Sequence, residues 1–173
     1  MDFIRESRKE CYCDIAGRAG DLTLVGNVDN IKVYAGKDVE NAQNFLLKTK
    51  ADTIRRFLTI LKPLKKVYGL LDESLHIFYD TEGSAIAFNS DGALFLNLRY
   101  FESWHDTQVK GGQPMKAMIA WFFTLSHEIA HNLIGSHSAE HSRFMNEISQ
   151  THLLPLFDEL QLVRFDHIAR EGH

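Results

Sequence analysis

Hydrophobic and polar positions along the 173-residue chain follow patterns that predict short strands and longer helices. The strand pattern consists of apolar, β-branched or aromatic runs bounded by turn residues. It occurs at 22–25, 31–34, 75–79, 85–89 and 93–98. The segment 26–30 predicts a hairpin between the first two strands, and Asn89-Ser90-Asp91-Gly92 is a strong hairpin turn between the last two.

A long helix is predicted to begin at Asp38, because apolar residues recur at helical spacing after it. Pro63 has no backbone N–H, so we expect it to kink or end this helix. The apolar positions are Phe45, Leu46, Ile54, Phe57, Leu58, Leu61, Leu64 and Tyr68.

The stretch Ala117–Phe144 organises the second half of the chain, and its first part predicts a helix that ends at Gly135. This helix is apolar nearly all round, which predicts a buried rather than a surface position. Its apolar positions are Met115, Met118, Ile119, Trp121, Phe122, Phe123, Leu125, Ile129 and Ala130. Ser138–His152 and Pro155–Arg170 predict two further helices, the second with proline in its first turn.

These elements predict one α+β domain over residues 21–173, preceded by an amino-terminal arm at 1–20. The composition, 45% hydrophobic and 24% charged, is typical of a globular protein. A net charge of −4 means that no overall field attracts nucleic acid or an anionic membrane. The charged first ten residues indicate no signal peptide, and two histidines and a glutamate within 117–134 argue against a membrane span.

Cys11 and Cys13 are the two cysteines of the chain and lie too close together for an ordinary disulfide. This favours a reducing, intracellular compartment, the cytoplasm or the nucleus. We interpret them as free thiols of the arm; the alternative is that one thiolate caps a zinc ion.

The segment from Lys48 to Lys66 carries seven basic residues and one acidic residue, Asp52. Such a stripe is typical of the solvated face of an amphipathic helix. The alternative is a surface that holds phosphates.

The residues with the clearest chemistry are His127, Glu128 and His131, which form a His-Glu-x-x-His pattern in the apolar helix. Histidines four residues apart lie on one face of a helix, so both imidazoles can reach one ion. Burying two imidazoles and a carboxylate in an apolar helix costs free energy if these groups have no partner. A metal ion with its bound water would give each of the three groups a partner. The alternative is that both histidines are hydrogen-bonded core residues.

A catalytic zinc ion takes three protein ligands, so a third must come from beyond the helix. A turn at Gly135 would bring His137 back toward the metal, and this is the first choice. His141 is the second, because Ser138 is a candidate N-cap and places His141 in the first turn of the next helix. Glu140 and Glu147 are weaker candidates, since a carboxylate from a following helix is also a known zinc ligand, and Glu147 is the third choice.

Read as His-Glu-x-x-His-x-x-x-Gly-x-His, the motif resembles that of the WLM and SprT-like zinc metalloproteases. It is also similar to the metzincin consensus, but the metzincin glycine would fall at Ile134. The resemblance implies that His127, His131 and His137 bind zinc and that Glu128 is the general base. It also implies a zincin-like fold and substrates associated with DNA, such as protein crosslinked to DNA.

In zincins an edge strand just ahead of the metal helix pairs with extended substrate. The strand 93–98 would take this place, so Phe95, Asn97 and Arg99 are candidate substrate-binding residues. The alternative is that this hairpin is ordinary core scaffold. The next segment, Tyr100–Pro114, breaks the periodicity and predicts a loop. Its Trp104, His105 and Asp106 could line the rim of the cleft.

Together these patterns predict a zinc-dependent endopeptidase in which Glu128 takes a proton from a zinc-bound water. The expected partner is a protein or peptide substrate, and one zinc ion is expected per chain. One alternative is an inactive domain in which zinc only pins the helices, with His137 and His141 closing a four-ligand site. The other is a zinc hydrolase of something other than peptides.

Overall fold

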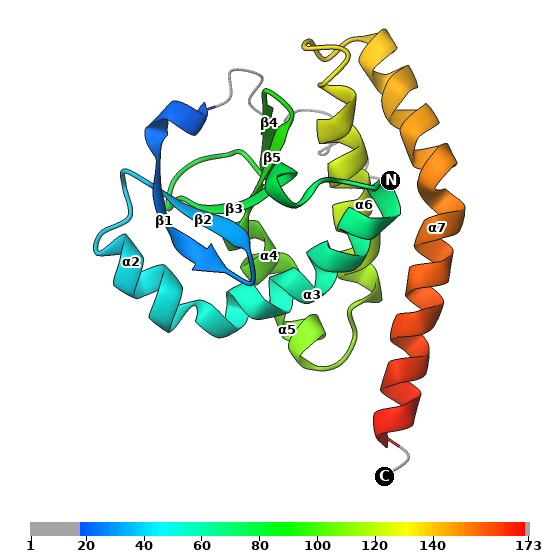
Figure 1. Ribbon diagram of the computed structural model, residues 1–173, viewed down its shortest axis with the longest axis horizontal. Coiled ribbons are helices and arrows are strands. Elements are labelled where there is room, and N and C mark those ends of the chain that lie inside the picture. Colours follow the sequence, from blue (N-terminus) through cyan, green and yellow to red (C-terminus); the bar gives the residue numbers. More distant parts are fainter. Residues whose placement is uncertain (1–17, 172–173) are drawn as a thin grey trace, which may run out of the picture.

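The computed structural model describes residues 18–171, and its centre is a five-stranded mixed sheet with helices packed on one side (Figure 1). The strands are β1 (Leu22–Val28), β2 (Ile31–Gly36), β3 (Leu75–Tyr79), β4 (Ala87–Ser90) and β5 (Ala93–Asn97). They lie in the order β1-β2-β3-β5-β4. The pairs β2–β3 and β3–β5 are parallel, while β1–β2 and β4–β5 are antiparallel. An α+β fold is therefore confirmed.

Both predicted hairpins are present. Asp29 and Asn30 turn β1 into β2, and Asp91 and Gly92 turn β4 into β5, all four with positive φ. Two-residue turns of this kind need positive φ, which glycine, asparagine and aspartate adopt most easily. The predicted arm at 1–20 is described only from Arg18, where the short turn η1 (Arg18–Asp21) begins. Cys11 and Cys13 lie outside the described residues.

The first helical region differs from the prediction at both ends. It begins at α2 (Ala42–Asn44), continues through one wide turn, η2 (Phe45–Thr49), and becomes the regular helix α3 (Ala51–Tyr68). Of the two outcomes predicted at Pro63, the end of the helix is wrong, because α3 continues past this proline to a left-handed cap at Gly69. Losing a backbone bond at proline costs roughly 3 kcal/mol. Buried residues on both sides of Pro63 outweigh this cost: Phe57, Leu58, Ile60, Leu61, Leu64 and Val67.

The predicted loop at Tyr100–Pro114 is also wrong, because it contains most of α4 (Leu98–Trp104) and all of α5 (Asp106–Lys110). The Asn97 side chain caps α4 by accepting a bond from the Arg99 N–H at 3.0 Å. Phe101 is buried and stacks on Phe57 of α3 with ring centroids 4.4 Å apart. These helices are too short to show a clear hydrophobic period, which is why the sequence pattern did not predict them. Contacts with α3 and the Asn97 cap stabilise them.

Helices α6 (Met115–Ala130) and α7 (Ala139–Glu171) pack along each other, and α7 follows the whole side of the molecule (Figure 1). The prediction of two helices after the motif is wrong, because α7 runs through Pro155 without a break. Leu156 and Leu160 are buried after this proline, so packing again holds the helix together. Helix α6 is not buried all round: Met115, Ile119 and Phe123 are exposed on one side.

The second face of the sheet carries a layer of rings rather than helix contacts. Neighbouring rings lie 4.7–5.5 Å apart in this layer, which consists of Tyr34, His76, Phe78, Phe88 and Phe95. His76 is only 6% exposed, and its Nδ1 has no hydrogen-bond partner among the described residues. Burial, and secondarily the charge of Lys32, lowers the pKa of His76 below its usual value of 6.5.

We therefore expect His76→Phe to make stability less sensitive to acid. Below pH 6.5 the unfolded chain binds a proton at His76 that the folded chain does not, so the free energy of unfolding falls as the pH falls toward the folded pKa. Phenylalanine removes this term, so the free energy of unfolding of the variant relative to the wild type should rise between pH 7 and pH 5.5, by at most about 1.4 kcal/mol per pH unit. Urea unfolding of both proteins at each pH measures it, and a constant difference contradicts it.

The edge position predicted for the strand 93–98 is wrong. Strand β5 lies between β3 and β4, so β4 is the edge strand on that side. Phe95 is buried in the ring layer, and the fully buried Asn97 donates to Asp80 Oδ1 and to the Ala85 carbonyl, each at 2.9 Å. The prediction that they bind substrate assumed an edge position. Parallel pairing with β3 instead places both residues inside the sheet.

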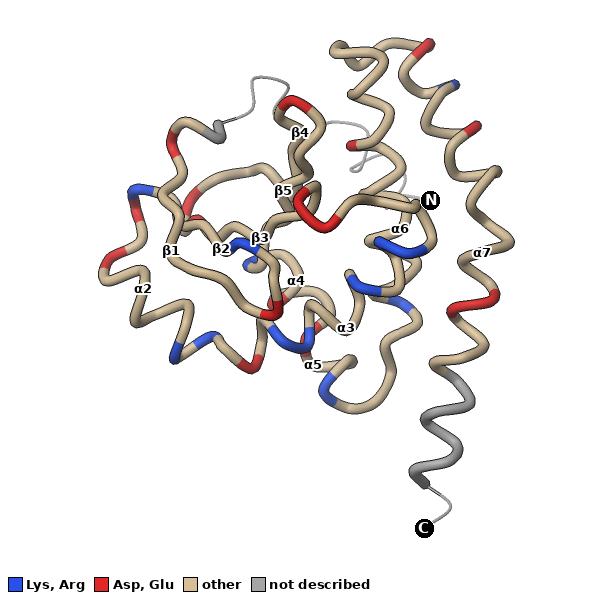
Figure 2. Tube along the Cα trace, in the orientation of Figure 1, with Lys and Arg blue, Asp and Glu red and all other residues tan. Residues whose placement is uncertain are grey.

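Six of the seven basic residues between 48 and 66 form ion pairs with nearby carboxylates, as the mixed charges around α3 indicate (Figure 2). The pairs are Lys50–Glu102, Arg55–Asp52, Arg56–Asp106, Lys62–Asp29, Lys65–Asp72 and Lys66–Glu159. The stripe is thus largely neutralised within the chain, which favours its interpretation as a solvated helix face.

No helix in the described part of the chain has the length and apolar character needed to span a membrane.

Candidate metal centre

Three histidines meet where α6 ends. His127 lies in the last turn of α6, His131 directly follows that helix, and His137 lies in the connection to α7. Their Nε2 atoms form a triangle with sides of 3.0 Å (His127–His137), 3.1 Å (His131–His137) and 3.2 Å (His127–His131). The structure therefore brings together the three histidines that the sequence ranked first, and this cluster could hold a metal ion.

The triangle agrees with what a tetrahedral ion requires. Zinc–imidazole bonds of about 2.0–2.1 Å at tetrahedral angles place ligand nitrogens about 3.3 Å apart. The observed sides of 3.0–3.2 Å differ from this by a few tenths of an ångström. The donor set, three imidazole nitrogens, is also one that zinc uses in catalytic sites.

The tautomer of His131 also suits metal binding through Nε2. Its Nδ1 lies 3.1 Å from the Ile134 carbonyl oxygen, to which it can only donate. The proton is thus on Nδ1, and the lone pair of Nε2 points into the triangle. A hydrogen bond from the second ring nitrogen is the usual support of a metal-binding histidine.

The surroundings of His127 and His137 favour the neutral form of both imidazoles. Burial, and then the neighbouring His141, His131 and His137, lowers the pKa of His127 to about 3. Burial and the nearby His131 also lower the pKa of His137. Neutral imidazoles are the form that binds metal ions, so the site is ready for an ion at neutral pH.

His141, the competing candidate, lies beside the triangle rather than in it. Its ring centroid is 4.1 Å from that of His131, but its Nε2 donates to the His127 carbonyl oxygen at 3.2 Å. The ring is almost fully buried. His141 therefore links the first turn of α7 to the last turn of α6. Glu147, the third candidate, lies on α7 with its side chain 56% exposed and within 3.9 Å of Arg143.

The turn that returns His137 to the cluster forms without a left-handed glycine. Helix α6 ends at Ala130, five residues before the predicted end at Gly135. The chain then tightens into turns in which the Asn132 N–H donates to the Ile129 carbonyl and the Leu133 N–H donates to the Ala130 carbonyl. Gly135 does not have positive φ. Ser138 is the predicted N-cap, since its Oγ accepts from the His141 N–H at 3.1 Å.

Glu128 lies between the two helix histidines and is 1% exposed. Its backbone carbonyl accepts a bond from Asn89 Nδ2 of β4 at 2.7 Å, and the same nitrogen donates to Asn132 Oδ1 at 2.7 Å. Asn89 thus ties the edge strand β4 to the end of helix α6. Sequence reasoning treated Asn89 only as a turn residue, and no local pattern indicates this contact.

The other predicted site residues lie elsewhere. Asp106 is held by Arg56 of α3 at 2.6 Å and 2.8 Å, and Trp104 is 47% exposed against Tyr100. Both precede α6, whose 16 residues separate them from the cluster by roughly 20 Å of helix. They are therefore not brought to the candidate metal centre.

Comparison of the chain with protein-family models, with curated protein sequences and with solved structures finds no match.

Proposed function

We propose that this protein is a zinc-dependent endopeptidase with a zincin-like fold. The observation that carries the proposal is the triangle of imidazole nitrogens with the buried Glu128 between two of its members. Three neutral imidazoles suit zinc and leave one position for water or substrate. His127, His131 and His137 would hold the ion, and zinc bound there would supply a polarised water of near-neutral pKa.

The other steps of the proposed reaction fall to groups of the chain itself. Glu128 accepts a proton at its carboxylate as the peptide carbonyl is attacked, and returns this proton to the leaving amine. The Ile134 carbonyl holds the tautomer of His131. Strand β4 presents an edge next to the metal helix, held there by Asn89, where an extended peptide could add as a further strand.

The position of His141 favours this reading over an inactive, zinc-pinned interaction domain. A closed structural site needs four ligands, but the Nε2 of His141 is hydrogen-bonded to the backbone. DNA-associated substrates receive little support, because the five basic residues of α3 form ion pairs with carboxylates of the chain.

The test is the incubation of zinc-loaded protein with a pool of unfolded proteins and peptides, with and without single-stranded DNA. Zinc content is measured by elemental analysis, and new peptide termini are identified by mass spectrometry. We expect one zinc per chain and new termini that disappear with a chelator. Stoichiometric zinc without any new terminus, together with four imidazole ligands by X-ray absorption, overturns the proposal in favour of the closed site.

A further inference from the structure

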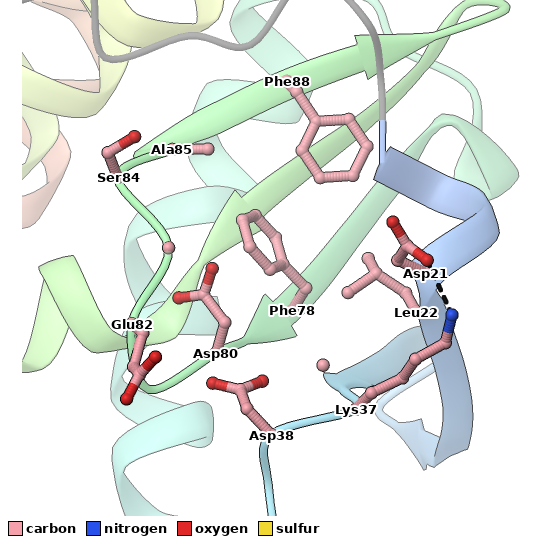
Figure 3. A pocket seen from close by; sticks show the side chains of 12 residues that line it. Asp21, Leu22, Lys37, Asp38, Phe78, Asp80, Glu82, Ser84, Ala85 and Phe88 are labelled. Atoms are coloured by element: carbon pink, nitrogen blue, oxygen red, sulfur yellow. Dashed lines mark hydrogen bonds and ion pairs between the residues drawn. The ribbon is translucent and has the colours of Figure 1, made fainter.

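A cavity of about 440 Å³ opens at the carboxyl ends of the parallel strands β2 and β3 (Figure 3). None of the residues that line it belongs to the histidine cluster. It is bounded by η1 and the start of β1, by the end of β2, and by the loop between β3 and β4. Its size is in the range of small-molecule sites, and crevices at this end of parallel strands commonly hold ligands.

One wall of the cavity is apolar. The rings of Phe78 and Phe88 lie 5.2 Å apart at 58°, and both are almost fully buried. Leu22 and Ala85 complete this wall. Such a wall is apolar and suits an apolar stem, and aromatic rings also attract a nearby cation.

The opposite side carries carboxylates that the fold holds in place (Figure 3). Asp38 Oδ2 accepts from the backbone N–H and the hydroxyl of Thr81, and these bonds lower the pKa of Asp38. Asp80 Oδ1 accepts from Asn97 Nδ2 and from Arg99 Nη2, each at 2.9 Å. A methyl group on Gly83 would overlap the Asp80 carboxylate, so this loop needs glycine there.

The charge of the lining is negative and only partly balanced. Lys37 is paired with Asp21 at 2.7 Å, and Arg99 neutralises Asp80. Asp38 and Glu82 have no ion pair with a Lys or Arg in the described part of the chain. Both line the cavity and are exposed to solvent, so a cationic ligand can reach either carboxylate without displacing an ion-pair partner.

We propose that this cavity binds an organic cation: a guanidinium or alkylammonium group on an apolar stem. The cationic head lies against Asp38 and Glu82, and the stem lies against Phe78 and Phe88. A small divalent metal ion fits less well, because the carboxylates of the lining do not converge on one point. Among the described residues, only His127, His131 and His137 form a group that could hold a metal ion.

Two sources offer this chemistry, a free small amine and a basic side chain of a peptide. The peptide source rests on the proposed function. Phe88 of the cavity is followed by Asn89, which contacts the end of the metal helix, so a peptide along β4 would pass both places. In that case the cavity selects substrates with arginine or lysine a few residues from the cleaved bond.

Binding is tested first on the metal-free full-length chain, which makes the result independent of catalysis. Butylguanidinium and butylammonium are titrated against the ¹⁵N-labelled protein, with butanol as the uncharged probe. We expect saturable shifts around 78–88 for the two cations, and at least fivefold weaker binding of butanol. Equal binding of all three probes, or shifts elsewhere only, overturns the proposal.

Asp38→Asn and Glu82→Gln keep the shape of each side chain and should each weaken cation binding about threefold to tenfold. Glu73→Gln, an exposed carboxylate at the other end of β3, is the matched control and should change nothing. Equal effects of all three variants would mean that only the general charge of the surface matters, which contradicts a site at this cavity.

The two sources are separated with a matched pair of peptides that differ only in arginine or citrulline. Preferential, Asp38-dependent cleavage of the arginine peptide by zinc-loaded protein assigns the cavity to substrate. If the metal-free chain binds the cations but the zinc-loaded protein cleaves neither peptide, the cavity is a site for a free amine. This result contradicts only the proposed peptidase function.

Discussion

Glu128→Gln is expected to lower peptide hydrolysis by about 10²–10⁴-fold while zinc stays bound at one per chain. Glutamine keeps the size of the side chain but cannot accept a proton in the buried position that Glu128 occupies. The three imidazoles are unchanged, so the affinity for the metal should remain. The measurement is the initial rate on a peptide that the wild-type protein cleaves, with zinc determined on the same samples.

Glu140→Gln is the control for this comparison. Glu140 is exposed in the first turn of α7, close in sequence to the cluster but outside it, and its loss should leave the rate unchanged. Hydrolysis that survives in Glu128→Gln and depends on zinc would rule out Glu128 as the general base.

The second large effect concerns the third ligand. We expect His137→Ala to lower zinc affinity more than about 100-fold, because it removes one of three nitrogens of the triangle. His141→Gln should lower it by only about tenfold, since the amide can keep the bond to the His127 carbonyl. Competition with a chromophoric chelator measures both affinities.

The ranking of the two variants is the decisive result. If His141→Gln loses as much zinc affinity as His137→Ala, His141 is itself a ligand and the site is closed. X-ray absorption of the zinc-loaded wild type provides a second measurement, because three imidazoles and one oxygen are expected for an open site.

Much of the candidate site was predictable because its spacing is local. His127 and His131 share a helix face through the geometry of one turn, and the capping role of Ser138 follows from its residue type and position. The choice between His137 and His141 was not predictable in the same way. It depends on how tightly the chain turns after Ala130, and on a hydrogen bond from His141 to the preceding helix.

The errors in the fold have a common physical cause. Pro63 and Pro155 are local helix breakers, yet both helices continue because apolar residues on either side of each proline are buried against other elements. Helix α4 has too few turns for a period, and its cap and the stacking of Phe101 on Phe57 form only in the folded chain.

The sequence by itself determined the strands, the two hairpins, and the helix that brings His127 and His131 together, because short-range periodicity and turn chemistry specify them. Only the tertiary structure decided that β4 rather than β5 lies at the edge, that His137 completes the triangle, and that Asp38 and Glu82 line a cavity with Phe78 and Phe88. Each of these depends on contacts between segments that are distant along the chain, and a local pattern carries no information about which distant segments meet.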